Sequence, residues 1–414
     1  MVPLTHSIPE MQAIALRTPQ GVIMHTGDWK LDPDPLVGPV TDEATLKKYG
    51  DEGVLAMVCD STNVFNDGES GSEAGVRENL TKIISECKGR VVVTTFASNI
   101  ARIESIIRAG EQAGRRIAIA GRSLRRVTTA AKESGYLQDA QPFLNERDIA
   151  DVRKEEILII CTGCQGEPMA ALSKIARGEH PSIRLSPGDT VIFSARKIPG
   201  NETRVSYIYN QLTHMGLELI TAKRHHVHVS GHPCRDELAR MYNLVRPKIA
   251  VPTHGEARHI HEHAKFAKAM QVPETVEAKN GSVILLQEGR ALEVGNVQSG
   301  YVAVDGGSLI PSDSSVLKVR RRIRDEGCVV ASVVLNKNNQ LMTAPRISAP
   351  GSMDAVEDKD LLDLMREEIE GALERLKPKD GNDKISDLIR TTLRKIFRSE
   401  LGKKPVLDVQ VIKL

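Results

Sequence analysis

The 414-residue sequence is poor in aromatic side chains, which make up 3% of it, and its formal net charge is only +2. With so few aromatic rings, base stacking cannot supply most of the affinity for a nucleic acid. Binding to a nucleic acid would therefore depend mainly on contacts with its phosphate backbone. Because the net charge is close to zero, a surface that binds nucleic acid would have to be a local basic patch.

Long apolar runs, a leader pattern and a cysteine framework are also missing. No run of about 18 apolar residues is present, which excludes a transmembrane helix. The opening MVPLTHSIPE lacks the order of a secretory signal, so we expect a cytoplasmic protein. Six cysteines scattered over the chain do not form a disulfide framework. The length predicts two or three domains.

Histidine is concentrated in one stretch, because eight of the twelve histidines lie between His225 and His263. Within it, HVHV and KIAVP are predicted to be buried strands, and residues 235–246 an amphipathic helix that ends at Pro247. A small turn with a histidine follows each strand, at His232 and at His254. Strand ends collect ligands in open α/β sheets, so this stretch predicts the active-site edge of an enzyme.

The same pattern occurs near the start of the chain, where Asp28 follows a predicted strand and Asp60 ends another. His6, Asp28 and His254 are ligand types of a zinc site, and Asp60 with His232 could form an acid/base pair. A single histidine or aspartate at a strand end is more often a turn or cap residue. The recurrence of the pattern favours a functional site.

Five motifs, THSIPE, HTGDWKLD, CDSTN, HVSGH and PTHGE, occur in this order and resemble those of the metallo-β-lactamase nucleases of the β-CASP group, in particular the ribonuclease J family. The resemblance implies an α/β fold: an αββα metallo-β-lactamase sandwich, an inserted α/β β-CASP domain and a small C-terminal α+β domain. It implies that His6 binds a first zinc ion, that Asp28 bridges two, and that His254 completes the second. It also implies that Asp60 and His232 act as acid and base, and that the substrate phosphate is held by His228, Val229, Ser230, Gly231 and His232.

One hallmark of that family, the HxHxDH signature with four zinc ligands, is not found in these 414 residues. We therefore expect a truncated chain with an incomplete sandwich, poor zinc binding and impaired activity. Lost strands would leave unpaired sheet edges around Val22 and Leu55, which predicts poor solubility or oligomers. The similar-looking His259, His261 and His263 are expected to form a mostly solvated helix face.

Residues 66–200 alternate between predicted strands and helices, with turns rich in Ser, Thr and Gly. Ser98 is expected to cap one of the helices. Such turns can bind phosphate through free N–H groups, although they are also the ordinary choice for strand-to-helix turns. The resemblance to a β-CASP domain favours RNA contacts for Ser98, Asn99, Arg122 and Ser123. Cys161 and Cys164 form a CxxC pair that fits a redox motif, but a family loop is favoured there.

The predicted domains are a first lactamase part (1–65), the β-CASP domain (66–200), a returning lactamase part (201–300), a linker (301–315) and a C-terminal domain (316–414). In the last of these, a helix rich in Lys and Arg near residues 390–404 could contact RNA phosphate or serve self-association, and a solvated face is the plainer alternative.

The function implied by the resemblance is zinc-dependent hydrolysis of 5′-monophosphorylated single-stranded RNA, by a 5′-to-3′ exoribonuclease with endonuclease ability that acts in RNA maturation and decay as a homo-oligomer. The first alternative is a non-catalytic truncated paralogue that binds RNA or a partner protein. A small-molecule hydrolase such as a thioesterase or lactonase fits less well, because it needs neither the inserted domain nor the tail.

Overall fold

The computed structural model describes residues 1–287, 289–354 and 356–414. The chain divides into two compact units, Met1–Gln298 and Ser299–Leu414. Among the described residues, none of the helices combines the length and the apolar character that a membrane span requires.

The first unit contains a six-stranded sheet in the order β1–β2–β3–β4–β10–β11. The first pairings, β1–β2 and β2–β3, are antiparallel, and the others are parallel. The strands are β1 (Val2–Pro3), β2 (Gln12–Thr18), β3 (Gly21–His25), β4 (Val54–Asp60), β10 (Ile249–Thr253) and β11 (Glu274–Thr275).

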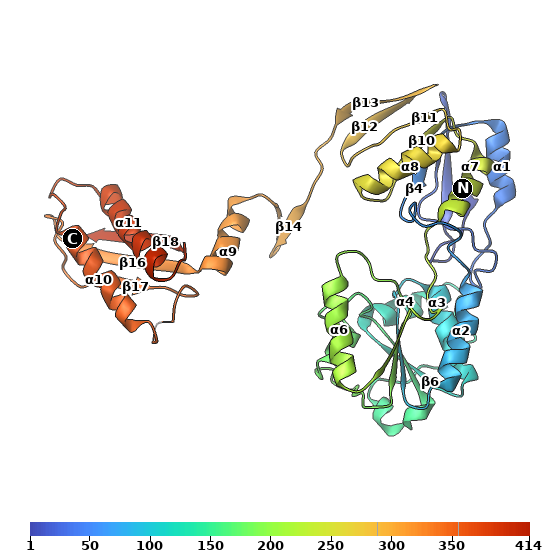
Figure 1. The fold of residues 1–414 in the computed structure, drawn as a ribbon, viewed down its shortest axis with the longest axis horizontal. Coiled ribbons are helices and arrows are strands. Elements are labelled where there is room, and N and C mark those ends of the chain that lie inside the picture. The colour runs from blue at the N-terminus through green and yellow to red at the C-terminus, as the bar shows by residue number, and fades with distance from the viewer. Residues whose placement is uncertain (288, 355) are drawn as a thin grey trace. The chain divides into compact units, whose positions relative to one another are not determined.

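One face of this sheet packs on three helices, α1 (Glu43–Glu52), α7 (Arg235–Val245) and α8 (Ala257–Ala269), through a core that includes the buried Trp29. The opposite face carries a smaller cluster around Leu55 and Val251, against which side chains of the hairpin β12 (Ser282–Gln287) and β13 (Arg290–Asn296) pack. The sheet is thus covered by helices on one face and partly by a hairpin on the other (Figure 1).

Unpaired edges do not occur at the two predicted positions. Val22 lies on β3, which pairs with β2 and β4, and Leu55 lies on β4, which pairs with β3 and β10. The expectation of unpaired edges at Val22 and Leu55 is therefore wrong, because both strands lie inside the sheet rather than at its border.

A second, fully parallel sheet in the same unit has the order β6–β7–β5–β8–β9. Buried Val, Ile and Leu side chains on these strands alternate between two cores, so helices cover both faces. One core includes residues of α2 (Glu73–Glu86), α3 (Ile100–Gln112) and α4 (Arg122–Glu133), and the other those of α5 (Ala171–Ala176) and α6 (Glu202–His214). The strands are β5 (Val91–Thr94), β6 (Arg116–Ala120), β7 (Ile157–Cys161), β8 (Thr190–Phe193) and β9 (Glu218–Thr221), and short 3-10 helices span Asp148–Asp151 and Lys154–Glu156.

The predicted alternation of strand and helix is confirmed, with three local differences. The sheet continues through β9 to Thr221, beyond the predicted boundary at residue 200. The cap of α3 is Asn99 rather than Ser98. The HVHV segment is not a strand, because the carbonyl of Val227 accepts hydrogen bonds from the side chains of Arg102 and Ser194 instead of a neighbouring strand.

The second unit begins with a small hairpin of β14 (Val302–Asp305) and β15 (Ser308–Pro311), which lies in the predicted linker. The basic helix α9 (Ser315–Glu326) follows. A three-stranded sheet in the order β17–β16–β18 packs on α10 (Lys359–Leu373) and α11 (Asn382–Glu400), which confirms the predicted α+β domain. The strands of this sheet are β16 (Cys328–Leu335), β17 (Arg346–Ser348) and β18 (Val406–Lys413).

Candidate active site

Four side chains, those of Asp28, Asp60, His232 and His254, converge at one edge of the six-stranded sheet, with ligand atoms within 4.8 Å of one another. Asp28 follows β3, Asp60 ends β4 and His254 follows β10. These strands are parallel neighbours, so their carboxyl ends meet at one edge. His232 joins them from the irregular segment before α7. We call these residues the four-residue group.

The group is held by short contacts between carboxylates and imidazoles. His254 Nδ1 lies 2.8 Å from Asp28 Oδ1 and 3.4 Å from Asp60 Oδ1. His232 Nδ1 lies 2.7 Å from Asp60 Oδ2, and Thr62 donates through its backbone N–H and its hydroxyl to Asp60 Oδ1. Every carboxylate of the group is thus paired with an imidazole.

These contacts set the protonation of the group. His254 donates hydrogen bonds to the carboxylates of Asp28 and Asp60, and these raise the pKa of His254 to about 10, so a metal-free chain holds an imidazolium there at neutral pH. The hydrogen bond with His254 lowers the pKa of Asp28. Burial acts to raise the pKa of Asp60, but hydrogen bonds from His232 and His254 outweigh it and hold that pKa well below its usual range. A metal that binds His254 has to displace its proton, so metal affinity rises with pH.

His6, the third predicted zinc ligand, lies beside the group. Its ring centroid is 5.1 Å from that of His232, and its Nδ1 is 2.6 Å from the carbonyl oxygen of Gly231. A Cβ at position 231 would lie 2.7 Å from His6 Cε1 and 2.3 Å from Ser7 Oγ, so this close approach requires glycine. The structure therefore brings together all five residues predicted as metal ligands or acid/base pair.

The segment predicted to hold phosphate, residues 228–232, is fixed by side chains from elsewhere. Asn63 donates through Nδ2 to Ser230 Oγ at 2.8 Å and to the carbonyl oxygen of His232 at 2.9 Å. Ser230 Oγ also accepts from the backbone N–H of His232. Val229 is buried, whereas His228 and Ser230 are partly accessible.

The RNA contacts predicted on the second sheet differ in their accessibility. Ser98 is exposed, as are Arg122 and Ser123 in the first turn of α4. Asn99 is only 3% exposed, and its Oδ1 accepts from the backbone N–H of Arg102 at 2.9 Å as the cap of α3. Its amide is therefore engaged in the fold, and the RNA role of all four residues stays a prediction.

The CxxC pair does not show the environment of a redox site. Cys161 and Cys164 are both buried and unpaired. Burial raises the pKa of each thiol to about 12, whereas reactive cysteines have lowered pKa values. The preference for a family loop over a redox motif is consistent with this environment.

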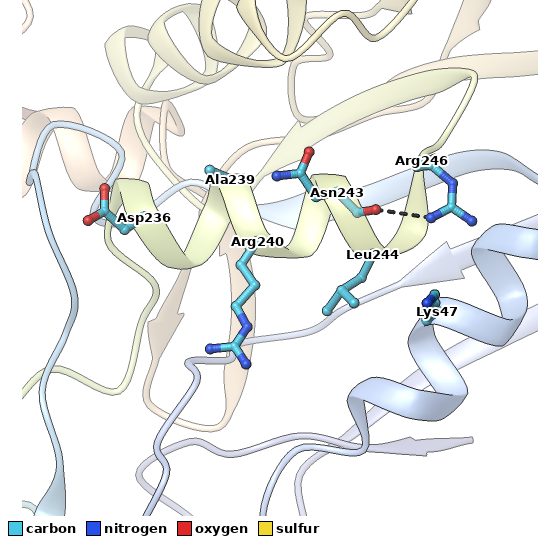
Figure 2. A pocket seen from close by; sticks show the side chains of 7 residues that line it. All are labelled: Lys47, Asp236, Ala239, Arg240, Asn243, Leu244 and Arg246. Atoms are coloured by element: carbon cyan, nitrogen blue, oxygen red, sulfur yellow. Dashed lines mark hydrogen bonds between the residues drawn. The ribbon is translucent and has the colours of Figure 1, made fainter.

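A surface hollow of about 460 Å³ opens between α1 and α7 and is separate from the four-residue group (Figure 2). Its cationic side chains include Arg240 and Arg246, which pair with Glu43 and Asp51. The arginines are thus already neutralised within the fold, and none of the four group residues lines the hollow. Its lining residues are Lys47, Asp236, Ala239, Arg240, Asn243, Leu244 and Arg246.

A buried histidine next to the four-residue group was not predicted from the sequence. His263 is 0% exposed and lies between two hydroxyls, with Nδ1 2.8 Å from Ser61 Oγ and Nε2 2.9 Å from Tyr242 Oη. The expectation that His259, His261 and His263 form a solvated face is therefore wrong for His263. His259 and His263 are four residues apart and were expected on one solvated face. The His263 side of α8 instead packs against the end of β4 and against α7.

Burial lowers the pKa of His263 to about 4, which predicts acid sensitivity. The unfolded chain takes up a proton below pH 6.5, whereas the folded chain resists it until about pH 4. The contribution of His263 to stability is therefore complete above pH 6.5 and is lost between pH 6.5 and 4, by about 1.4 kcal/mol per pH unit. Between pH 6.5 and 4, the free energy of unfolding measured in urea should fall less steeply with decreasing pH for His263→Gln than for wild type. His261→Gln, on the exposed side of α8, should keep the wild-type dependence, and equal slopes for all three proteins would contradict the assignment.

Comparison with known proteins extends over most of the chain. The model of the ribonuclease J β-CASP domain matches residues 88–212, that of the Zn-dependent metallo-hydrolase RNA specificity domain matches residues 219–278, and that of the ribonuclease J C-terminal domain matches residues 315–414. Ribonuclease J of Sinorhizobium meliloti is 39% identical, with 100% of this chain and 74% of the relative covered. Ribonuclease J of Thermus thermophilus is 35% identical (99% and 71% covered), and that of Corynebacterium glutamicum is 36% identical (99% and 58% covered).

Proposed function

The chain belongs to the ribonuclease J family of metal-dependent RNA hydrolases, and on that premise we propose that the four-residue group is its site of phosphodiester hydrolysis. The observation that carries the proposal is the convergence of Asp28, Asp60, His232 and His254 at the ends of parallel strands. Neighbouring groups whose pKa values are shifted strongly, as those of Asp60 and His254 are, are typical of catalytic and metal-binding sites.

The donors present fit a zinc ion, which accepts imidazole nitrogen and carboxylate oxygen. Asp28 and His254 would hold the ion, because their ligand atoms lie 2.8 Å apart and both side chains are partly exposed. His6, whose ring lies beside that of His232 at the same site, would be a further donor. When bound, such an ion supplies a hydroxide near neutral pH for attack on phosphorus.

Asp60 and His232 form the proton-transfer pair of the proposal. The Asp60 carboxylate is buried and accepts from His232 Nδ1, so it fixes the orientation of the ring. The remaining nitrogen, Nε2, can then give a proton to the departing 3′ oxygen. Thr62 keeps the carboxylate in place through its two hydrogen bonds.

The finer activity that we propose is 5′-to-3′ cleavage of 5′-monophosphorylated single-stranded RNA with endonuclease ability, in RNA maturation and decay in the cytoplasm, by a homo-oligomer. Segment 228–232 would hold the reacting phosphate, and the exposed Ser98, Arg122 and Ser123 would contact neighbouring phosphates. Sequence preference should be slight, because the chain is 3% aromatic and its contacts would go to the backbone.

Metal-dependent cleavage is the first test. At millimolar zinc or manganese, the chain should degrade 5′-monophosphorylated single-stranded RNA, and EDTA should abolish the reaction. Asp28→Asn and His254→Ala should be inactive at the same metal concentration. Cleavage that persists in EDTA, or in both variants, would contradict the proposal.

Metal stoichiometry is the second test. Without the HxHxDH ligands, the donors in these 414 residues are too few for two four-coordinate ions. We therefore expect less than one zinc ion per chain to remain after dialysis against metal-free buffer, measured by atomic emission. Two retained zinc ions would show that the described donors are not the whole site.

The alternative is a non-catalytic chain that binds RNA or a partner protein. The shortage of metal donors favours it. It predicts RNA binding in a filter assay with no cleavage even at millimolar metal, whereas the nuclease proposal predicts both.

A further inference from the structure

Arg102, on α3, is completely buried, and the proposed chemistry leaves it without a role. Its guanidinium makes a two-pronged contact with Glu73, with Nε 2.9 Å from Oε2 and Nη2 2.7 Å from Oε1. The third nitrogen, Nη1, lies 2.9 Å from Ser194 Oγ, 3.2 Å from the carbonyl oxygen of Val227 and 3.4 Å from His228 Nδ1.

These contacts join four segments at one point. Glu73 begins α2, Ser194 follows β8, and Val227 and His228 belong to the irregular segment that leads to His232. Arg102 therefore connects the second sheet with the segment predicted to hold phosphate, beside the direct hydrogen bond from Ser194 Oγ to the carbonyl oxygen of Val227.

The contact with His228 constrains the proton on its ring. A guanidinium has five N–H donors and no acceptor, so a ring nitrogen that faces it has to accept. Nδ1 of His228 is that nitrogen. A neutral ring then carries its proton on Nε2, for which no other described residue provides a hydrogen-bond partner.

We propose that Arg102 is a positioning residue that fixes His228 as the Nε2–H tautomer, so that the ring presents a hydrogen-bond donor to a phosphate oxygen of bound RNA. This inference rests on the proposed function, because it deepens the account of how the site holds its substrate. The neutral state has separate support: burial and the nearby charges of Arg102 and Arg196 lower the pKa of His228 to about 3.

Arg115 provides a matched control. It is also a buried arginine, 5% exposed, and it donates to the carbonyl oxygens of Gly89 and Ile157 at 2.8 and 3.2 Å. Those carbonyls lie at the beginnings of β5 and β7, at the edge opposite to Ser194. Arg115→Lys should therefore lose comparable hydrogen bonding without touching the His228 segment.

The experiment is a long-range ¹H–¹⁵N NMR spectrum of ¹⁵N-histidine-labelled chain at pH 7, with His228→Ala to assign the His228 signals. In wild type and in the control variant Arg115→Lys, the His228 ring should have a protonated Nε2 and an unprotonated Nδ1. Folded Arg102→Lys should show a mixture of tautomers. A protonated Nδ1 in wild type, or a pure Nε2–H ring in folded Arg102→Lys, would overturn the tautomer assignment. Should Arg102→Lys fail to fold, the wild-type spectrum still tests the tautomer assignment, because a protonated Nδ1 of His228 would overturn it.

RNA affinity tests the second half of the proposal. In EDTA, where no cleavage occurs, Arg102→Lys and His228→Ala should each weaken binding of single-stranded RNA by about tenfold, as expected for one hydrogen bond to a charged group. The double variant should bind no more weakly than His228→Ala, and Arg115→Lys should bind as wild type. Unchanged affinity in His228→Ala would overturn the phosphate contact. The spectrum and the affinity are both measured without turnover, so a chain that never cleaves RNA would sink the proposed function and leave this inference standing.

Discussion

Asp60→Asn is expected to slow metal-dependent RNA cleavage by about a hundred-fold to ten-thousand-fold, the range found when a proton-transfer pair is lost. The change is isosteric, so the packing around Asp60 should survive. An amide, however, has no charged oxygen to accept the hydrogen bond of His232 Nδ1, and it can present its NH₂ group to that nitrogen instead. The measurement is the single-turnover cleavage rate at saturating metal.

Asp34→Asn is the matched control for this experiment. Asp34 is exposed, and its carboxylate has no part in the four-residue group. It should cleave at the wild-type rate. If Asp60→Asn also kept the wild-type rate, Asp60 and His232 could not be the proton-transfer pair.

Arg102→Met is expected to reduce the free energy of unfolding by about 3–5 kcal/mol, the usual effect of breaking a buried ion pair from one side. The substitution leaves the Glu73 carboxylate buried without its cation. The carbonyl oxygens of Ser194 and Val227 also lose the hydrogen bonds that Arg102 donates to them. Urea denaturation followed by circular dichroism measures the loss.

Arg108→Met supplies the comparison on the same helix. Arg108 is 36% exposed and pairs with the largely exposed Asp139, so its loss should cost less than about 1 kcal/mol. Equal losses in the two variants would show that burial does not decide the strength of these ion pairs.

The sequence predicted the residues that converge at the strand ends and missed the residues that hold them in place. Asp28, Asp60 and His254 each follow a run of buried β-branched or apolar residues, so their convergence follows from strand order once the sheet is parallel. His232 was found through its motif, although the strand predicted before it does not exist.

The supporting residues leave no comparable trace in the sequence. Arg102 lies in an ordinary amphipathic helix, and only the meeting of α2, β8 and the 227–228 segment gives it partners. His263 looked solvated because its neighbours on α8 are polar, whereas its partners Ser61 and Tyr242 come from distant parts of the chain. Contacts of this kind depend on tertiary packing, which periodicity does not report.

The central claim is that Asp28 and His254 bind a catalytic metal ion beside Asp60 and His232. A zinc-edge anomalous difference map from crystals of the chain soaked in excess zinc tests it most directly. The account predicts a peak about 2.0–2.2 Å from a carboxylate oxygen of Asp28 and from Nδ1 of His254, the ring nitrogen that faces Asp28. A map with no peak there, or with zinc bound only elsewhere, such as at the exposed His261, would contradict it.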